Sequence, residues 1–340
     1  MTNMFQGKNI LVTGGTGSIG SGIVRKVLQY KPEVIRVLSN DENGLFNLEQ
    51  ELIGYHNLRF LVGDVKDKER LRRAIEGIDL VFHAAALKHV PLCEYNPFEA
   101  VKANVIGTQN LIEVAMEVEV EKLITISTDK AVNPVNVMGA TKLLAERLTI
   151  SANYYKGERK TAFSCVRFGN VLDSRGSVVP LFVEQIAKGG PVTVTDPNMT
   201  RFVMSIAAAV DLVLKAATTA QGGEVFVLKM PALRIGDLAE VVIEELAPRY
   251  GYGSEGIDVL ITGRRQGEKD HEELLTEDGA VNAYETDGMF VISPEKNQKK
   301  KGKMAKRYTS NDGKLLNKAE IKEMLMANLP YFSDVAGAGE

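Results

Sequence analysis

The sequence contains no tryptophan and very little cysteine. Its 340 residues include two cysteines, Cys93 and Cys165. Both fall in segments expected to be packed, so we interpret them as free thiols rather than as a disulfide. Free thiols are typical of a reducing compartment, and a disulfide-stapled secreted scaffold is therefore excluded.

Long apolar runs and a large net charge are also missing. No apolar stretch approaches the roughly 18 residues of a membrane-spanning helix. The short polar start and the apolar run from Asn9, which ends at once in glycines, do not resemble a signal peptide. The formal net charge of -3 gives no general basic field, so nucleic acid is not the expected partner. We expect a cytoplasmic protein without a membrane span.

The first half of the chain alternates β-branched runs with helical periodicity. The expected strands are Asn9–Thr13, Val34–Ser39, Arg59–Gly63, Leu80–His83, Lys122–Ser127 and Thr161–Phe168. The expected helices are 19–30, 44–54, 68–76, 97–118 and 140–155. This alternation predicts an α/β fold with a Rossmann-type doubly wound parallel sheet covered by helices on both faces.

Beyond about residue 170 the alternation loosens. Helical patterns at 178–188, 206–219 and 235–249 are separated by short strands near 192–195, 224–228 and 257–261. We predict a Rossmann domain over 7–170, then a smaller and mainly substrate-binding lobe over 171–330, parts of which return to the Rossmann core, and a tail over 331–340. The basic run 294–307 is interpreted as a solvated loop, with contact to a neighbouring subunit or an acidic partner as the alternative.

A glycine-rich segment, TGGTGSIG, follows the first expected strand and opens the first expected helix. In such a turn Gly14 permits the tight bend, Gly17 lets the backbone approach a pyrophosphate, and Gly20 lets the helix lie close to the sheet. The helix N-terminus then offers free amides and its positive dipole end to the phosphates. This context predicts a nicotinamide dinucleotide site. Its expected contacts are Gly14, Thr16, Gly17, Ser18, Ile19 and Gly20.

Further cofactor contacts are expected where the next strands end. Asp41, about 20 residues after the last glycine, is placed to hold the adenine-ribose diol. This favours NAD, although neighbouring polar groups can help to bind the 2′-phosphate of NADP. Asp64 is placed to meet the adenine amino group, and the alanines at 84–86 either let the cofactor pass or simply pack the core. The full set is Ser39, Asn40, Asp41, Asp64, Val65, Ala84, Ala85, Ala86 and Asn104.

Several longer segments together resemble one known family. They are TGGTGSIG, GDV, FHAAALKHVPLCEYNP, NVIGT, ISTDKAVNPVNVMGATK, VRFGNVLDSRGSVVPLF, TRFVMS and GEKDHEELL. From about residue 7 to about residue 325 the chain resembles the CapD-like polysaccharide-biosynthesis branch of the extended short-chain dehydrogenases. Within this branch it is similar to the UDP-N-acetylglucosamine 4,6-dehydratases that invert carbon 5. The branch also contains proteins called 4-epimerases, so membership alone does not fix the reaction.

The resemblance implies a tightly bound nicotinamide cofactor that is recycled. Carbon 4 of the sugar is oxidised, carbon 5 loses a proton, the carbon 6 hydroxyl leaves as water, and the hydride returns to carbon 6. Lys130 stands at the position of the carbon 5 base and Asp129 at that of the carbon 6 acid. Thr128 is expected to hydrogen-bond the carbon 4 hydroxyl, and Lys142 to hold the nicotinamide ribose. A lysine acts as a base only when neutral, so the pKa of Lys130 must fall well below about 10.4.

Met138 departs from the wider superfamily. Many sugar-nucleotide dehydrogenase-like enzymes have a Tyr four residues before the lysine that corresponds to Lys142, and a methionine cannot carry a proton. The group that takes the carbon 4 proton is therefore open between Thr128, through a water, and Asp129. One alternative function is a UDP-sugar 4-epimerase, against which Lys130 argues because epimerisation needs no carbon 5 base. The other is a non-catalytic dinucleotide-binding protein.

The substrate side is expected to take the UDP part of a nucleotide sugar. Arginine suits a diphosphate because its planar charged group can bind two oxygens at once. Asn170, Arg265 and Glu268 resemble UDP-contacting positions of the family, and Lys88, Ser177 and Arg201 are further candidates for substrate binding. For each of the six, a surface or structural role is the alternative. We expect no metal site, because no Cys or carboxylate cluster accompanies His83 and His89. By analogy with similar folds we expect a homo-oligomer.

Overall fold

The computed structural model describes residues 4–286, 288–294 and 303–332. The chain forms two compact units from interleaved segments. Unit 1 takes its described residues from Met1–Phe168, Ala207–Lys229 and Glu273–Tyr308, and unit 2 takes them from Gly169–Ile206, Met230–Glu272 and Thr309–Glu340. Most of the basic run predicted at 294–307 lies outside the described residues.

Unit 1 contains, within the described ranges, a ten-stranded sheet of order β16-β14-β15-β10-β6-β5-β4-β1-β2-β3. Neighbouring strands are parallel throughout the part of the sheet with the order β10-β6-β5-β4-β1-β2-β3. The strands β15, β14 and β16 extend the sheet beyond β10 with antiparallel pairing. This confirms the predicted Rossmann-type fold. The strands are β1 Asn9–Thr13, β2 Val34–Ser39, β3 Leu58–Val62, β4 Leu80–His83, β5 Lys122–Thr128, β6 Ala162–Phe168, β10 Val225–Leu228, β14 Ala283–Thr286, β15 Met289–Ile292 and β16 Lys303–Met304.

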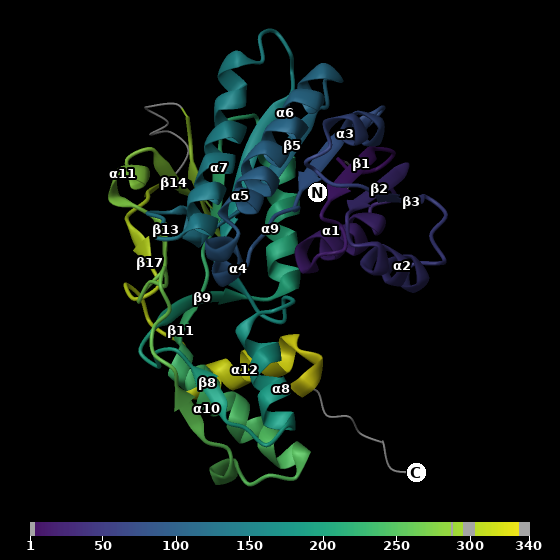
Figure 1. Cartoon of the computed structure of the whole chain (residues 1–340). Helices are drawn as coiled ribbons and strands as arrows, with labels where there is room; N and C mark the ends of the chain where they lie inside the picture. The colour runs from purple at the N-terminus through teal and green to yellow at the C-terminus, as the bar shows by residue number, and fades with distance from the viewer. Residues whose placement is uncertain (1–3, 287, 295–302, 333–340) are drawn as a thin grey trace. The chain divides into compact units, whose positions relative to one another are not determined.

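Helices cover both faces of this sheet (Figure 1). Apolar residues of α3, α6 and α7 share one core with strand residues such as Leu11, Leu123 and Phe163. On the other face α1 and α9 are joined by the ion pair of Lys26 with Asp211. Burying one large apolar side chain contributes about 1.5–3 kcal/mol, so this core holds the strand ends in place. The helices are α1 Ser18–Leu28, α2 Glu42–Glu51, α3 Lys68–Ile75, α4 Val90–Tyr95, α5 Pro97–Ala100, α6 Gly107–Glu117, α7 Val137–Tyr155, α9 Ile206–Thr219 and α11 Glu277–Ala280.

Unit 2 has smaller sheets, of order β11-β9-β7 and β12-β8. Its core is formed by apolar residues of α8, α10 and α12, including Phe182, Val242 and Leu325. Its elements are β7 Asn170–Val171, α8 Val178–Ala187, β8 Val192–Val194, β9 Thr200–Met204, β11 Ala232–Arg234, α10 Ile235–Leu246, β12 Val259–Ile261 and α12 Lys318–Asn328. Two further strands, β13 (Glu273–Leu275) and β17 (Tyr308–Thr309), pair with each other. None of the helices in the described parts of the chain has the length and apolar character needed to cross a membrane.

Candidate functional site

The strand order of the large sheet reverses between β1 and β4. The last residues of these strands, Thr13 and His83, are register partners. Open α/β sheets bind ligands at the carboxyl ends of strands where the order reverses. The glycine turn follows Thr13 and the alanine segment follows His83, so the two lie side by side. Gly14 has φ +65°, and a Cβ there would lie 2.6 Å from the Ala85 Cα, so only glycine permits this approach.

The N-terminus of α1 is open on the side where a diphosphate would bind. Its N-cap is Gly17, which offers no side-chain hydrogen bond. A Cβ added at Gly17 would have one close neighbour, the Gly14 carbonyl oxygen at 3.2 Å. Nearby, the hydroxyl oxygens of Thr16 and Ser39 are 2.8 Å apart. Helix N-termini attract anions, so this turn, with Ser18, Ile19 and Gly20 in the first turn of α1, fits a dinucleotide.

The ends of β2 and β3 bring together the residues predicted for the adenosine part. Asn40 Nδ2 donates a hydrogen bond to Asp64 Oδ2 at 3.2 Å, and Val65 beside them is buried. Asp41 is also the N-cap of α2, and its Oδ1 accepts from the Gly44 amide at 2.9 Å. The Asp41 carboxylate therefore has a structural task in addition to the one predicted for it.

Asn104 lies in a π-helix, Val101–Ile106, and is buried. Its Oδ1 accepts from the Leu87 amide at 2.8 Å, and its Nδ2 donates to the Leu87 carbonyl and to Thr141 Oγ1, both at 2.9 Å. Asn104 thus fixes the segment that contains Ala84, Ala85 and Ala86. Lys88, which follows this segment, is exposed.

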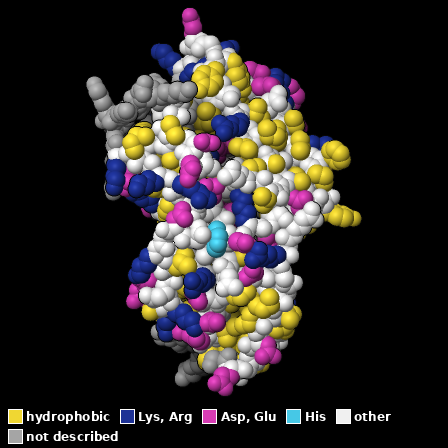
Figure 2. Space-filling view, turned by 90° about the vertical axis from the view of Figure 1, so that its left-hand side faces the viewer, with side chains coloured by type: hydrophobic (Ala, Val, Ile, Leu, Met, Phe, Trp, Pro, Cys, Tyr) yellow, Lys and Arg dark blue, Asp and Glu magenta, His cyan; other side chains and the backbone are white. Residues whose placement is uncertain are grey.

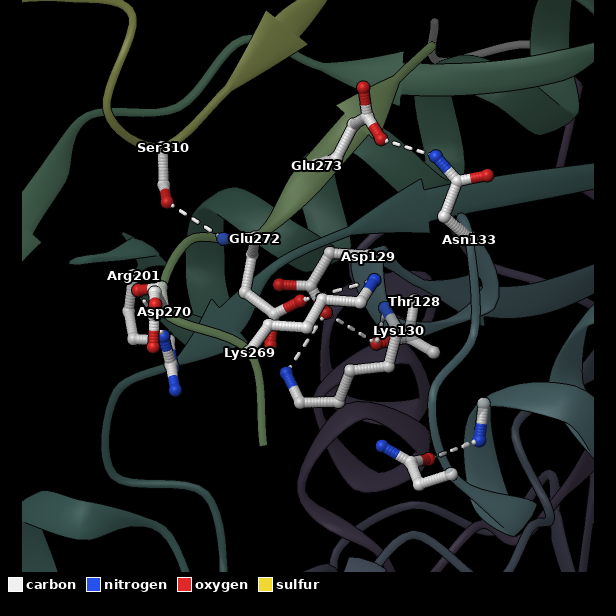
Figure 3. Close-up of polar contacts among 12 residues, drawn as sticks. Thr128, Asp129, Lys130, Asn133, Arg201, Lys269, Asp270, Glu272, Glu273 and Ser310 are labelled. Atoms are coloured by element: carbon white, nitrogen blue, oxygen red, sulfur yellow. Dashed lines mark hydrogen bonds and ion pairs between the residues drawn. The ribbon is translucent and has the colours of Figure 1, made fainter. Parts of the chain in front are cut away.

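Asp129 and Lys130 lie in a one-turn 3-10 helix, Asp129–Ala131, directly after β5 (Figure 3). Thr128 Oγ1 donates to Asp129 Oδ1 at 2.8 Å, and Lys130 Nζ approaches the same oxygen at 3.0 Å. The Asp129 side chain is fully buried, whereas that of Lys130 is 24% exposed. The structure therefore brings the predicted acid, base and hydroxyl into direct contact at a strand end.

Lys142 and Met138 occupy successive turns of α7. Lys142 is buried, and its Nζ donates to the Ile126 carbonyl oxygen at 2.6 Å. Burial lowers the pKa of Lys142 to about 8, although the nearby Cys165 and Glu146 favour the charged form. Met138 packs with Cys93 in a small apolar cluster. The position of the superfamily Tyr is therefore filled by a packed apolar side chain.

A buried polar network next to the Asp129–Lys130 turn was not predicted from the sequence. Glu146 Oε2 accepts from Ser127 Oγ at 2.8 Å, and the Glu146 carboxylate forms an ion pair with Arg167. Arg167 Nη1 also donates to the Leu274 carbonyl oxygen at 2.8 Å. The available signals were an arginine inside an otherwise apolar strand pattern and a glutamate one turn after Lys142. Both are buried, which is unusual for charged residues unless they are paired.

Two predicted substrate residues of unit 2 lie in strands. Asn170 begins β7, where it pairs with Val203 of β9. Arg201 lies in β9 and is buried, and its Nη1 donates to the Thr200 carbonyl at 2.8 Å and to the Asp270 carbonyl at 3.2 Å. Part of the Arg201 guanidinium therefore holds backbone in place.

The other substrate candidates of unit 2 lie in loops. The Arg265 amide donates to Glu268 Oε2 at 3.2 Å, and the Arg265 side chain is exposed. Ser177 is the N-cap of α8, and its hydroxyl is buried without a hydrogen-bond partner among the residues that the structure describes. No group of three or more His, Cys, Asp or Glu in the described ranges could hold a metal ion.

Surface charges of both signs are mixed. Arg264 contacts Asp196 at 2.8 Å, and Lys318 forms an ion pair with Glu240. On the face shown in Figure 2, Lys and Arg side chains lie among Asp and Glu side chains. This face therefore lacks the broad basic area that is typical of a nucleic-acid interface.

The chain is similar to several known proteins. The chain is 65% identical to "Uncharacterized membrane protein MJ1061" of Methanocaldococcus jannaschii, covering 96% of this chain and 97% of the relative. It is 44% identical to a "UDP-N-acetylglucosamine 4,6-dehydratase (inverting)" of Campylobacter jejuni, covering 86% of this chain and 84% of the relative. It is 38% identical to a "UDP-glucose 4-epimerase" of Rickettsia typhi, covering 95% and 96%.

A solved structure is also similar. The X-ray structure of Pen from Bacillus thuringiensis matches with a TM-score of 0.91 and 45% identity, covering 96% of this chain and 99% of that one. Residues 10–294 match the family described as "Polysaccharide biosynthesis protein". The chain therefore belongs to the CapD-like polysaccharide-biosynthesis family of extended short-chain dehydrogenases, whose members modify nucleotide sugars.

Proposed function

We propose that the protein is a UDP-N-acetylglucosamine 4,6-dehydratase that inverts carbon 5 and supplies surface polysaccharide or glycan synthesis. The observation that carries this proposal is the contact of Lys130 Nζ with Asp129 Oδ1 at 3.0 Å, directly after β5. An amine and a carboxyl group in one turn offer a base for carbon 5 and an acid for carbon 6. The relative named as an inverting dehydratase supports the same assignment.

In this proposal each polar side chain of the site has a separate role in the reaction. A nicotinamide dinucleotide held by the glycine turn and Lys142 would supply hydride transfer, from carbon 4 and back to carbon 6. Thr128 holds the carbon 4 hydroxyl, Lys130 removes the carbon 5 proton, and Asp129 gives a proton to the departing carbon 6 hydroxyl, which leaves as water. When hydride returns to carbon 6, carbon 5 takes up a proton from water on the face opposite to Lys130, which inverts its configuration. Lys142 binds the nicotinamide ribose from α7. The carbon 4 hydroxyl proton leaves through Thr128 and a water, because Met138 cannot accept it and Asp129 must already hold the proton that it gives to the carbon 6 hydroxyl.

The contact between Asp129 and Lys130 also provides the protonation state that the reaction needs. Moving one proton from the ammonium to the carboxylate converts an ion pair into a neutral amine and a neutral acid. Desolvation disfavours charged groups, and Asp129 is fully buried, so the neutral pair is favoured when substrate covers the site. The same exchange yields the base for carbon 5 and the acid for carbon 6.

We also assign residues to the cofactor and to the substrate. Asp41 favours NAD over NADP, because a carboxylate binds a ribose diol and repels a 2′-phosphate. The arginines Arg201 and Arg265, with Lys88, Asn170, Ser177 and Glu268, are assigned to the UDP-sugar. We further propose a homo-oligomer in the cytoplasm.

The test is incubation of the protein with UDP-N-acetylglucosamine and a catalytic amount of NAD, with the product analysed by mass spectrometry. We expect a keto-sugar that is one water lighter than the substrate, without net reduction of NAD. A product of unchanged mass would instead support the second candidate, a 4-epimerase, which the relative named UDP-glucose 4-epimerase favours.

The Lys130→Ala variant tests the assignment of the base. We expect it to oxidise carbon 4 and to accumulate reduced cofactor, because that step does not use Lys130. Its turnover should fall by about 10²–10⁴, the typical contribution of a positioned general base. The carbon 5 proton should also fail to exchange with deuterium from the solvent, whereas Asp129→Asn should permit exchange and slow the loss of water. Normal carbon 5 exchange in Lys130→Ala would assign the base to another residue.

A further inference from the structure

Glu273 lies 140 positions from Asn133 in the sequence, yet their side chains meet. Glu273 begins β13 and is buried. Its Oε2 accepts a hydrogen bond from Asn133 Nδ2 at 2.7 Å (Figure 3). Its Oε1 accepts from Arg307 Nε at 2.8 Å. No task for Glu273 or Asn133 follows from the proposed chemistry.

Asn133 is the residue through which the chain leaves the Asp129–Lys130 turn. The turn is closed by a hydrogen bond from the Val132 amide to the Asp129 carbonyl at 3.0 Å. Asn133 then has φ +44°, in the left-handed region that asparagine tolerates better than most residues. A hydrogen bond that fixes the Asn133 side chain therefore also fixes the direction in which the turn ends.

The strand that carries Glu273 is tied to the other end of the same turn. Arg167 donates to the Leu274 carbonyl and pairs with Glu146, which accepts from Ser127 Oγ at 2.8 Å. Ser127 is two residues before Asp129. Both ends of the segment 127–133 are therefore connected to β13, one through Asn133 and one through Glu146 and Arg167.

We propose that Glu273 is a positioning residue that, through Asn133, holds Lys130 and Asp129 in the geometry needed for proton transfer at carbons 5 and 6; this inference rests on the proposed function. A buried carboxylate is unfavourable unless it is paired, and here both of its oxygens are bound to side chains of unit 1. Displacement of a catalytic group by about 1 Å can lower a rate by roughly 10²-fold. Oxidation at carbon 4 does not use Lys130 and should be less sensitive.

Two single variants separate the Asn133 bond from the ion pair. Glu273→Ala should lower kcat by about 10–100-fold while KM changes by less than about threefold, since the residue acts through the turn and not on the substrate. Carbon 5 deuterium exchange should slow more than formation of reduced cofactor. The matched control Arg307→Gln removes the ion pair but keeps the Asn133 bond, and should retain kcat within about threefold.

An exchange of donor and acceptor provides a rescue. Asn133→Asp sets two carboxylates against each other and should lower kcat by about as much as Glu273→Ala. Adding Glu273→Gln to Asn133→Asp restores one amide-to-carboxylate hydrogen bond in the opposite direction, and should recover at least about tenfold. A double variant no faster than Asn133→Asp would overturn the proposal.

Hydrogen–deuterium exchange of the free protein gives a readout that does not depend on turnover. Peptides covering 128–136 should exchange faster in Glu273→Ala than in the wild type, and at the wild-type rate in Arg307→Gln. Unchanged exchange together with unchanged kcat in Glu273→Ala would overturn the positioning role. A wild-type protein that forms no water-loss product would instead overturn the proposed function, while the exchange measurement would still decide whether Glu273 holds the turn.

Discussion

Lys142 is a buried cation whose Nζ donates a hydrogen bond to the Ile126 carbonyl oxygen at 2.6 Å. Burial lowers its pKa from 10.5 to about 8. At neutral pH Lys142 is therefore charged, but its charged form is less stable in the folded protein than in water. A shift of this size corresponds to about 3 kcal/mol. The residue is therefore expected to lower stability, which fits a residue kept for the cofactor binding that we propose for it.

Lys142→Met should accordingly raise the stability of the cofactor-free protein at pH 7 by roughly 1–3 kcal/mol and remove turnover. Between pH 8 and about 10.5 the unfolded chain keeps a proton that the native chain loses, so wild-type stability rises with pH there. The advantage of the variant should shrink over that interval. Urea unfolding at pH 7 and pH 10 checks both points, and a variant less stable than the wild type at pH 7 would contradict them.

Some residues of the site could be predicted from the sequence, and others could not. Thr128, Asp129 and Lys130 are contiguous, so a motif alone is enough to predict that they meet. The partners of this turn are distant: Glu146 lies 19 positions from Ser127, and Glu273 lies 140 positions from Asn133. Their contacts depend on strand pairing and helix packing, which local patterns do not encode.

At the level of the element, α2 depends on the residue predicted to select the cofactor. Asp41 caps α2 through the Gly44 amide, so Asp41→Ala would mix loss of the cap with loss of the ribose ligand. Asp41→Asn is cleaner, because asparagine caps helices as well as aspartate does. We expect unchanged unfolding and a shift of the NADP-to-NAD affinity ratio toward NADP by roughly tenfold, equivalent to about 1.4 kcal/mol. Titration of both cofactors measures the ratio, and tighter wild-type binding of NADP would show that the preference for NAD is wrong.

Among the elements, the strands of the first half could be predicted because each is a short apolar run between turn residues. The C-terminal helix α12 was not predicted, although Asn317 and Glu320 form a capping box that the sequence displays. The hairpin of β14 and β15 was also missed. Its turn contains Gly288 at φ +77°, and its place in the large sheet depends on pairing of β15 with β10.

At the scale of the whole molecule, the parallel sheet brings buried polar groups together near the carboxyl ends of its strands. His83 ends β4, and its ring nitrogens lie 2.7 Å from Thr13 Oγ1 and 3.0 Å from Thr108 Oγ1. These bonds join β1, β4 and α6 beneath the glycine turn. Burial, and secondarily the positive charge of Lys142, lowers the pKa of His83 to about 3.

This His83 makes folding stability depend on pH. Between its ordinary pKa of about 6.5 and about 3, the unfolded chain binds a proton that the native chain does not, so stability falls as the pH falls. The loss from this group should be about 1.4 kcal/mol per pH unit, or about 2 kcal/mol from pH 6.5 to 5. Urea unfolding of the wild type at pH 7, 6 and 5 measures how steeply the free energy of unfolding changes with pH. His83→Gln keeps a polar side chain for the two threonines but does not titrate, so its stability should fall less steeply with pH than that of the wild type. Equal slopes for the wild type and His83→Gln would show that His83 does not bring about the acid sensitivity.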